Sequence, residues 1–211
     1  MLKNKKICII GMGYIGLPMA ALLANKGYCI HGVDINRKNV ETINRGETHI
    51  FEPDLDQLVR KAVNTNYLSA HLEPSTADVF IIAVPTPFKI NKNDISDIPT
   101  PNLDYIFNAT KTISTYIKPG NLILLESTSP VGTTERISNL LKNEGIDLDE
   151  IFIAYSPERV LPGQILKELV NNDRVVGGVN EESTDKASKF YDQFIEGEIF
   201  ETDSRTAEMI K

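Results

Sequence analysis

The sequence predicts an α/β fold with a doubly wound, mostly parallel sheet and helices on both faces. Apolar, β-rich segments alternate with helical patterns along the whole chain, which is typical of this architecture. Several apolar segments, such as 79–84, show no polar alternation, as expected for strands buried on both faces. The expected strands are 7–10, 30–33, 79–84, 122–126, 151–154, 174–178 and 198–201.

Helical periodicity fills the intervals between these strands. The expected helices are 14–25, 36–44, 53–63, 103–117, 133–141, 181–194 and, at the C-terminus, 205–211. Gly27 is suited to end the first helix, and residues 202–204 offer N-caps for the last one. The segment 88–102 is polar, contains prolines and has no period, so we predict a long surface loop there.

Composition and charge exclude several classes of protein. The 211 residues include 41% hydrophobic and 24% charged residues, which excludes a disordered chain. Two Cys cannot form a disulfide scaffold. The net charge of −7 argues against a nucleic-acid partner. Since the apolar run 7–10 is too short for a signal peptide or a membrane span, we expect a mature cytoplasmic N-terminus and no membrane partner.

A glycine-rich turn follows the first strand. Gly11, Gly13 and Gly16 form a G-x-G-x-x-G motif that opens the first helix, the context that a Rossmann-type dinucleotide site requires. Gly11 permits the tight turn, Gly13 lets a pyrophosphate approach the backbone, and Gly16 lets the helix pack on the strand. The motif predicts that phosphates bind at the helix N-terminus.

An acidic residue ends the second strand. Asp34 lies 23 positions after Gly11 (34 − 11), where a carboxylate bonds the adenosine ribose hydroxyls. It would repel a 2′-phosphate, so NAD is favoured over NADP. The nearby Arg37 keeps NADP open as an alternative, and the motif alone also allows FAD.

Polar residues follow several of the other predicted strands. Ligands of a parallel sheet bind at the carboxyl ends of its strands. We therefore expect Asp34 and the segments 85–86, 126–128 and 156–158 to converge on one crevice. Alternatively, Thr86 and Thr128 only cap turns. Glu126 closes an apolar strand, which predicts that it faces a cleft or an ion pair.

Two other kinds of site are disfavoured. The three His residues are scattered without metal-ligand spacing, so we expect no metal. The serines at 127 and 129 lack the G-x-S-x-G context of a hydrolase.

Further segments resemble the nucleotide-sugar 6-dehydrogenases, the family of UDP-glucose and GDP-mannose dehydrogenases. They are G-M-G-Y-I-G-L-P at 11–18, V-D at 33–34, V-P-T-P at 84–87, E-S-T-S-P-V-G-T-T at 126–134 and S-P-E-R-V-L-P-G at 156–163. Arg159 and Val160 stand where the UDP-glucose branch usually has Phe-Leu. This departure resembles the N-acetylhexosamine branch, and so do I-N-R-G-E at 43–47, E-P-D-L at 52–55, N-D-R-V-V-G-G at 172–178 and S-R-T-A-E-M at 204–209.

The resemblance implies a reaction and its residues. It implies two successive NAD-dependent oxidations at C6 of UDP-N-acetyl-D-mannosamine to the uronate, through a thioester in the intact enzyme, for bacterial surface polysaccharide synthesis. Catalytic roles carry over to Lys211, Thr128 and Glu158. The implied substrate contacts are Arg159, Val160 and Lys211; the implied cofactor contacts are Gly11, Gly13, Tyr14, Ile15, Gly16, Asp34, Thr86 and Thr128.

The family's nucleophilic Cys lies in a Gly-rich segment beyond the position of Lys211. The only thiols here are Cys8 and Cys29, in or beside strands, where Cys behaves as a small hydrophobe. We therefore expect this chain to bind NAD without completing the oxidation. The expected division is an NAD-binding domain at 1–202 and the start of an inter-domain helix at 203–211, with the central and C-terminal UDP-sugar domains absent; the intact enzyme is expected to be a homodimer.

Three alternatives stay open at this point. The substrate could be UDP-N-acetylglucosamine or UDP-N-acetylgalactosamine. The chain could be a stand-alone NAD-binding module without chemistry of its own. It could also be a 6-phosphogluconate or 3-hydroxyacid type of dehydrogenase, although the P-E-R-V-L-P-G segment at 157–163 favours the nucleotide-sugar family.

Overall fold

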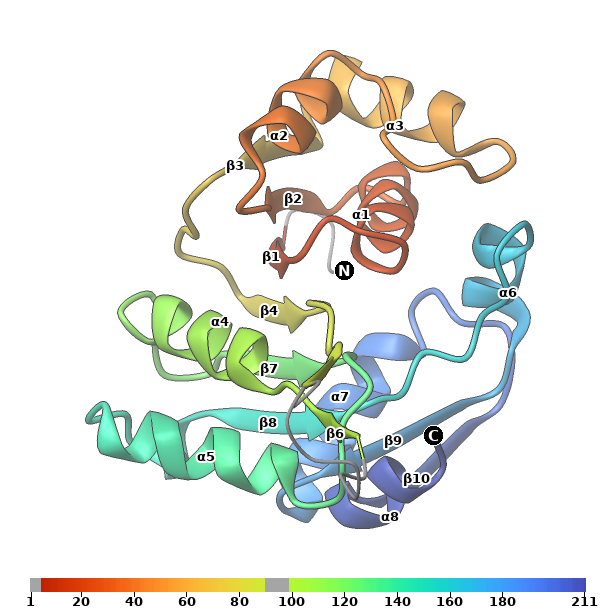
Figure 1. Ribbon diagram of the computed structural model, residues 1–211. Coiled ribbons are helices and arrows are strands. Elements are labelled where there is room, and N and C mark those ends of the chain that lie inside the picture. Colours follow the sequence, from red (N-terminus) through yellow and green to blue (C-terminus); the bar gives the residue numbers. More distant parts are fainter. Residues whose placement is uncertain (1–4, 90–98) are drawn as a thin grey trace.

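A computed structural model describes residues 5–89 and 99–211. Its main sheet has the strand order β10-β9-β8-β7-β4-β1-β2-β3 (Figure 1). The strands are β1 Lys6–Ile10, β2 Cys29–Val33, β3 Leu68–His71, β4 Val79–Ile82, β7 Leu122–Leu125, β8 Phe152–Tyr155, β9 Arg174–Gly178 and β10 Ile199–Asp203. All pairs are parallel except β8 with β9, so the predicted mostly parallel sheet is confirmed.

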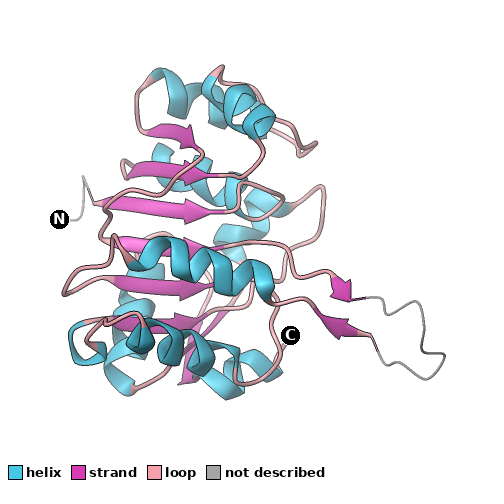
Figure 2. Cartoon of the chain, turned by 60° about the vertical axis from the view of Figure 1, so that its left-hand side comes forward, coloured by secondary structure: helices cyan, strands magenta, loops and turns pink. Residues whose placement is uncertain are grey.

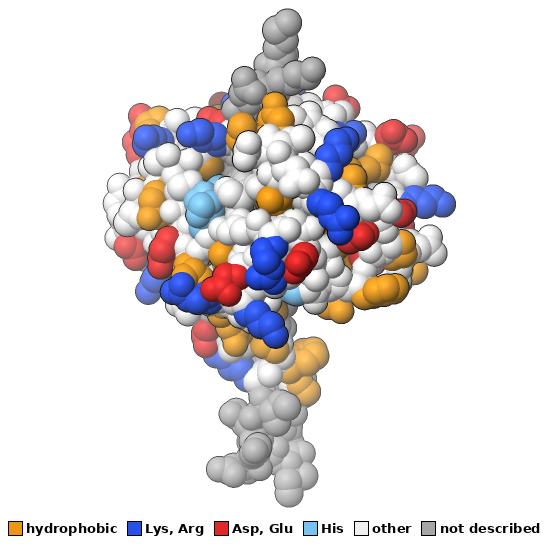
Figure 3. Space-filling model, turned by 90° about the horizontal axis from the view of Figure 1, so that it is seen from above, with side chains coloured by type: hydrophobic (Ala, Val, Ile, Leu, Met, Phe, Trp, Pro, Cys, Tyr) orange, Lys and Arg blue, Asp and Glu red, His pale blue; other side chains and the backbone are white. Residues whose placement is uncertain are grey.

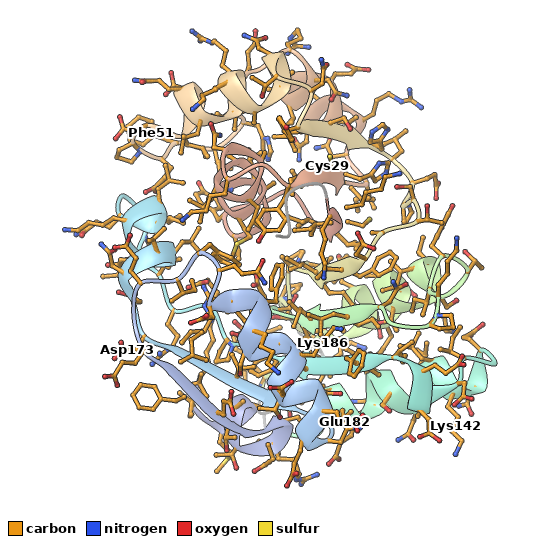
Figure 4. The ribbon with its side chains drawn as sticks, turned by 180° about the vertical axis from the view of Figure 1, so that it is seen from behind. Cys29, Phe51, Lys142, Asp173, Glu182 and Lys186 are labelled. Carbon is orange, nitrogen blue, oxygen red and sulfur yellow. The ribbon has the colours of Figure 1, made fainter. Side chains whose placement is uncertain are left out.

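The central strands are apolar on both faces because helices cover both. Along β7, Leu122 and Leu124 belong to one buried cluster, while Ile123 and Leu125 belong to the other. Figure 2 shows the two helical layers on either side of the sheet. The first layer comprises α1 Gly16–Asn25, α2 Arg37–Asn44, α3 Leu55–Asn64, α6 Ile165–Asn171 and α7 Glu181–Tyr191; the second comprises α4 Asp104–Ser114, α5 Thr133–Asn143 and α8 Ser204–Met209. In Figure 4, Glu182 and Lys186 mark α7 on the back of the molecule.

Local capping sets several helix ends. Gly27 follows α1 with a φ of 97°, which a glycine adopts without strain. The side chain of Asn36 caps α2, and that of Asp203 caps α8 by accepting a hydrogen bond from the Thr206 N–H at 2.9 Å. The predicted end of the first helix is confirmed, and of the residues 202–204 offered as N-caps of the last helix, Asp203 is the cap.

The structure also corrects the predicted elements. Strand β3 and helix α6 were not predicted, because each is short and carries no strong apolar run. The predicted loop at 88–102 was wrong at its ends, where β5 Phe88–Lys89 pairs with β6 Thr100–Pro101 and projects from the body (Figure 2). The rest of that segment, 90–98, lies outside the described residues.

The histidines are less scattered than the sequence suggested. The rings of His31 and His71, on neighbouring strands, stack with centroids 3.9 Å apart. Burial, and secondarily the neighbouring His31, lowers the pKa of His71. The pair lies on the edge strand β3 and its neighbour β2, and neither residue lines the cavity described below.

On the face seen from above, basic and acidic side chains are intermixed rather than gathered into one patch (Figure 3). Among residues 5–89 and 99–211, no helix is both long and apolar enough to span a bilayer.

Shortening a central side chain should destabilise this sheet. Leu124 is fully buried between β4 and β8, so Leu124→Ala should lower the free energy of unfolding by about 2–5 kcal/mol through the lost burial and the cavity left behind. Urea denaturation measures this. Leu161→Ala is the control because Leu161 is 63% exposed, and an equal loss in the control would contradict the assignment of the core.

Candidate dinucleotide-binding site

A cavity of about 580 Å³ opens at the carboxyl ends of β1, β2, β4 and β7. Parallel strands that end on one edge of the sheet bring the segments after them together. The cavity is lined from the first turn, from the end of β2, from the segments after β4 and β7, from α4 and from the C-terminus. Its lining includes Gly11, Gly13, Tyr14, Ile15, Asp34, Thr86, Tyr105, Glu126, Ser127, Thr128 and Lys211.

The three glycines of the first turn play different structural roles. Gly11 has a φ of 96°, and a Cβ there would lie 2.5 Å from the Ala83 carbonyl oxygen. A Cβ on Gly16 would lie 1.8 Å from the Gly11 carbonyl oxygen, so this contact requires glycine. A Cβ on Gly13 would meet no described atom within 4 Å. Gly13 therefore leaves open space beside the N-terminus of α1, where no side chain of the N-cap residue bonds the free amides.

Asp34 faces this turn. Its Oδ2 accepts a hydrogen bond from the Met12 N–H at 3.2 Å, and its Oδ1 accepts one from the Asn36 N–H at 2.8 Å. These bonds hold the carboxylate at the cavity and leave lone pairs on both oxygens. An open phosphate cradle beside a fixed carboxylate fits a dinucleotide with a free ribose 2′-hydroxyl.

The structure brings most of the predicted site residues together, but not all of them. Gly16 supports the turn by close packing and is not part of the lining. The segment 156–158 also stays outside the lining, so the predicted convergence holds for three of the four post-strand segments. Arg159 and Val160 lie outside as well. The Arg159 guanidinium donates to the Asp173 carbonyl at 2.9 Å, and Figure 4 places Asp173 at the outer edge of the molecule.

A buried charge cluster lies beside the cavity. The Arg174 guanidinium is 2.5 Å from Glu158 Oε2 and 3.6 Å from Glu126 Oε1, and all three side chains are at most 4% exposed. Glu126 Oε1 also accepts a hydrogen bond from the Tyr191 hydroxyl at 2.8 Å, and the Arg174 guanidinium stacks over the Tyr191 ring. The expected ion pair of Glu126 is confirmed.

Burial raises the pKa of Glu126 to about 7, against the opposing effect of Arg174 and with a further rise from Glu158. Its Oε2 has no hydrogen-bond partner among the described residues. Glu126 is therefore a carboxyl group that changes its charge near neutral pH at the edge of the cavity.

Lys211 joins the cluster to the cavity. This residue lines the cavity, and its ammonium donates a hydrogen bond to the Glu158 carbonyl oxygen. Partial burial lowers the pKa of this ammonium, although the nearby carboxylates of Glu158 and Glu126 oppose the shift. The cluster thus holds two acidic and two basic groups that can balance in charge.

Some residues that shape the site have weak sequence signals. Glu52 accepts hydrogen bonds from the Gly163 and Ile165 N–H groups, both at 2.7 Å, and so ties the segment after β8 to the loop before α3. In Figure 4 its neighbour Phe51 marks that loop. Glu52, Arg174 and Glu208 were not singled out from the sequence, since their partners lie far away along the chain. The one available signal was their presence in the family-like segments.

The thiols have no part in this cavity. Burial raises the pKa of the Cys8 thiol to about 11, which makes it a poor nucleophile. Neither Cys8 nor Cys29 lines the cavity.

The fold and the cavity define a dinucleotide-binding domain of the Rossmann type. The family description "UDP-glucose/GDP-mannose dehydrogenase family, NAD binding domain" matches residues 5–195. The chain belongs to this family, and these residues are its NAD-binding domain.

Curated relatives narrow the comparison. The chain is 50% identical over 215 residues to UDP-N-acetyl-D-mannosamine dehydrogenase of Campylobacter jejuni, covering 98% of the chain and 51% of the relative. It is 48% identical over 216 residues to an NDP-N-acetyl-D-galactosaminuronic acid dehydrogenase of Ralstonia nicotianae, covering 98% and 49%. The chain thus spans about half the length of the curated relatives it matches.

Comparison with solved structures supports the same family. The UDP-N-acetyl-mannosamine dehydrogenase Cap5O of Staphylococcus aureus superimposes with a TM-score of 0.90 at 37% identity, covering 97% of this chain and 49% of that one. A 3-hydroxyisobutyrate dehydrogenase of Mycobacterium tuberculosis reaches a TM-score of 0.61 at 18% identity, covering 98% and 57%, and shares the fold alone. The nucleotide-sugar family is therefore favoured over the 3-hydroxyacid type.

Two alanine substitutions in the first turn should separate binding from folding. Gly13→Ala should leave the free energy of unfolding unchanged but weaken NAD binding about ten-fold or more, because the methyl group enters the phosphate space. Gly16→Ala should instead lower the free energy of unfolding by about 1–3 kcal/mol through overpacking against Gly11. Calorimetric titration and urea denaturation measure the two effects. Unchanged NAD affinity in Gly13→Ala would place the phosphates elsewhere.

The buried Glu126 should make stability depend on pH. Its pKa of about 7 in the folded state exceeds the ordinary 4.5, so the native state binds the extra proton and loses stability as pH rises from about 4.5 through 7. Between pH 5 and 8, the free energy of unfolding of the unmodified protein should fall by about 1–3 kcal/mol relative to that of Glu126→Gln. Urea denaturation at several pH values in this range measures the change. The control is Glu144→Gln, because Glu144 is exposed. Parallel pH profiles for the unmodified protein and Glu126→Gln would refute the assignment.

Proposed function

We propose that this chain is the NAD-binding part of an NAD-dependent 6-dehydrogenase of UDP-N-acetyl-D-mannosamine. The observation that carries the proposal is the cavity, in which an open phosphate cradle at Gly13, a fixed Asp34 carboxylate and the Lys211 ammonium lie together. When bound, NAD would supply the hydride acceptor. The domain at 1–202 would bind it, and the segment 203–211 would begin the helix toward a substrate domain.

The sugar assignment is supported by the relatives. Several that cover almost the whole chain at 47–50% identity carry the name UDP-N-acetyl-D-mannosamine dehydrogenase. The second candidate is an N-acetyl-D-galactosaminuronate-forming dehydrogenase, which the 48% identity to the Ralstonia relative supports. We also propose a cytoplasmic site of action, where such enzymes would supply uronates for bacterial surface polysaccharides.

We assign the following roles to the residues at the cavity. Asp34 would accept hydrogen bonds from the adenosine ribose, and Tyr14, Ile15 and Thr86 would line the path of the cofactor. Thr128 follows β7, which β4 and β1 separate from β2, the strand that Asp34 follows, and its hydroxyl would orient a substrate or water. The Lys211 ammonium would stabilise negative charge that develops on the sugar oxygen.

For the segment after β8 we propose substrate roles. Glu158 would act in proton transfer, and Arg159 and Val160 would contact the sugar nucleotide. At present Glu158 Oε1 accepts the Arg159 N–H at 2.9 Å, while Oε2 holds Arg174. Proton transfer at Glu158 therefore requires Oε2 to exchange the guanidinium for another partner, and substrate contact requires Arg159 to leave Asp173.

Titration of the chain with NAD and NADP tests the cofactor assignment. NAD should bind more tightly than NADP, because the Asp34 carboxylate accepts ribose hydroxyls and repels a 2′-phosphate. Asp34→Asn should weaken NAD binding about ten-fold or more, as expected when hydrogen bonds to a charged group are lost. The same substitution should reduce the difference in affinity between NAD and NADP.

The control for this titration is Asp56→Asn, on the exposed surface of α3, which should bind NAD as the unmodified protein does. With NAD and UDP-N-acetylmannosamine, the unmodified chain should produce no steady NADH signal, since neither of its thiols lines the cavity. Tighter binding of NADP than of NAD would overturn the cofactor assignment, and steady turnover would overturn the expectation that this chain alone does not complete the oxidation.

A further inference from the structure

A carboxylate at the far end of the chain occupies the N-terminus of α5. Glu208 Oε2 accepts the Gly132 N–H at 2.5 Å, and Glu208 Oε1 accepts both the Thr134 N–H at 2.7 Å and the Thr134 hydroxyl at 2.6 Å. Glu208 is only 3% exposed. The N-cap residue of α5 is Gly132, which has no side chain to bond these amides. A residue 74 positions away therefore satisfies the helix terminus.

The two ends of this contact lie in two segments that reach the cavity, although Gly132, Thr134 and Glu208 do not line it themselves. Residue 132 ends the turn that begins at Thr128, which lines the cavity after β7. Glu208 lies in α8, three positions before Lys211, which lines the same cavity. One buried carboxylate thus connects the segment that carries Thr128 to the segment that carries Lys211.

Other contacts of α8 leave its last turn dependent on Glu208. Ala207 is buried against Gly177 of β9, and Arg205 forms an ion pair with Glu135 of α5 at 2.9 Å. That ion pair is about half exposed on both sides, so it contributes little. The next residues, Met209 and Ile210, are exposed. After Ala207, Glu208 accordingly fixes the backbone that leads into Lys211, whose ammonium itself bonds the Glu158 carbonyl oxygen.

We propose that Glu208 is a positioning residue that holds the Lys211 ammonium in the cavity and couples it to the Thr128 turn. This inference rests on the proposed role of Lys211. A charged carboxylate that accepts three hydrogen bonds is strongly held. Its loss leaves buried N–H groups without a partner, and the helix end is then free to move with Lys211.

The test follows Lys211 itself in the 211-residue chain. Lysines carry isotope-labelled methyl groups introduced by reductive methylation, the Lys211 signal is assigned with Lys211→Arg, and its pKa is read by NMR titration. In the unmodified protein this pKa should lie below that of the exposed lysines, since partial burial lowers it. Glu208→Gln keeps the size of the side chain but removes its charge and one acceptor. It should return the Lys211 pKa to that of the exposed lysines.

The matched control is Glu135→Gln, which breaks the exposed contact between the same two helices and should leave the Lys211 pKa unchanged. Hydrogen exchange supplies a second readout. The Thr134 amide should exchange about ten-fold faster or more in Glu208→Gln, the factor expected for a lost hydrogen bond to a charged group, and at the unmodified rate in Glu135→Gln.

One result would overturn the proposal: faster exchange at Thr134 with an unchanged Lys211 pKa, because Glu208 would then only cap α5. If Glu208→Gln does not fold, Thr134→Val replaces it, since it removes one of the three donors. It should shift the Lys211 pKa in the same direction by less, and no shift would reject the proposal. NAD titration keeps the two hypotheses apart: failure of the unmodified chain to bind NAD rejects the proposed function, whereas the Lys211 titration decides the role of Glu208.

Discussion

The contact between the Gly11 carbonyl and the Cα of Gly16 is the constraint on which the site depends. It allows α1 to begin directly against the end of β1, so that free amides and the positive end of the helix face the cavity. Any side chain at position 16 would separate helix and strand. The neighbouring Gly13 then provides the space for a phosphate, and Asp34 is held across from it through the Met12 amide.

Two buried carboxylates give the outer loops of the site their shape. Glu208 binds the turn that precedes α5, and Glu52 binds the turn that precedes α6, each through two backbone N–H groups. In both cases the loop after a central strand is held by a residue from a distant part of the chain. Helix N-termini accept such carboxylates because their amides are unpaired and the helix dipole favours negative charge.

The buried charges beside the cavity form a different kind of arrangement. Arg174 is shared between Glu126 and Glu158, and Lys211 adds a second positive group. Such charges are costly to bury unless they are paired, so the position of Lys211 affects the charge state of the whole cluster. A site that exchanges protons near neutral pH is consistent with this balance, since one carboxyl of the cluster already titrates there.

The sequence alone determined most of the alternation of strands and helices and the phosphate-binding turn, and it favoured NAD as the cofactor, because these depend on local periodicity and on glycine and Asp34 at fixed spacing. It also indicated Thr86, Thr128 and Lys211 through family-like segments. Only the tertiary structure decided that Arg159 and Val160 lie outside the cavity, that β8 and β9 are antiparallel, and that Glu52, Arg174 and Glu208 support the site. The partners of these residues are brought close by folding, and no local pattern encodes a contact across 74 positions.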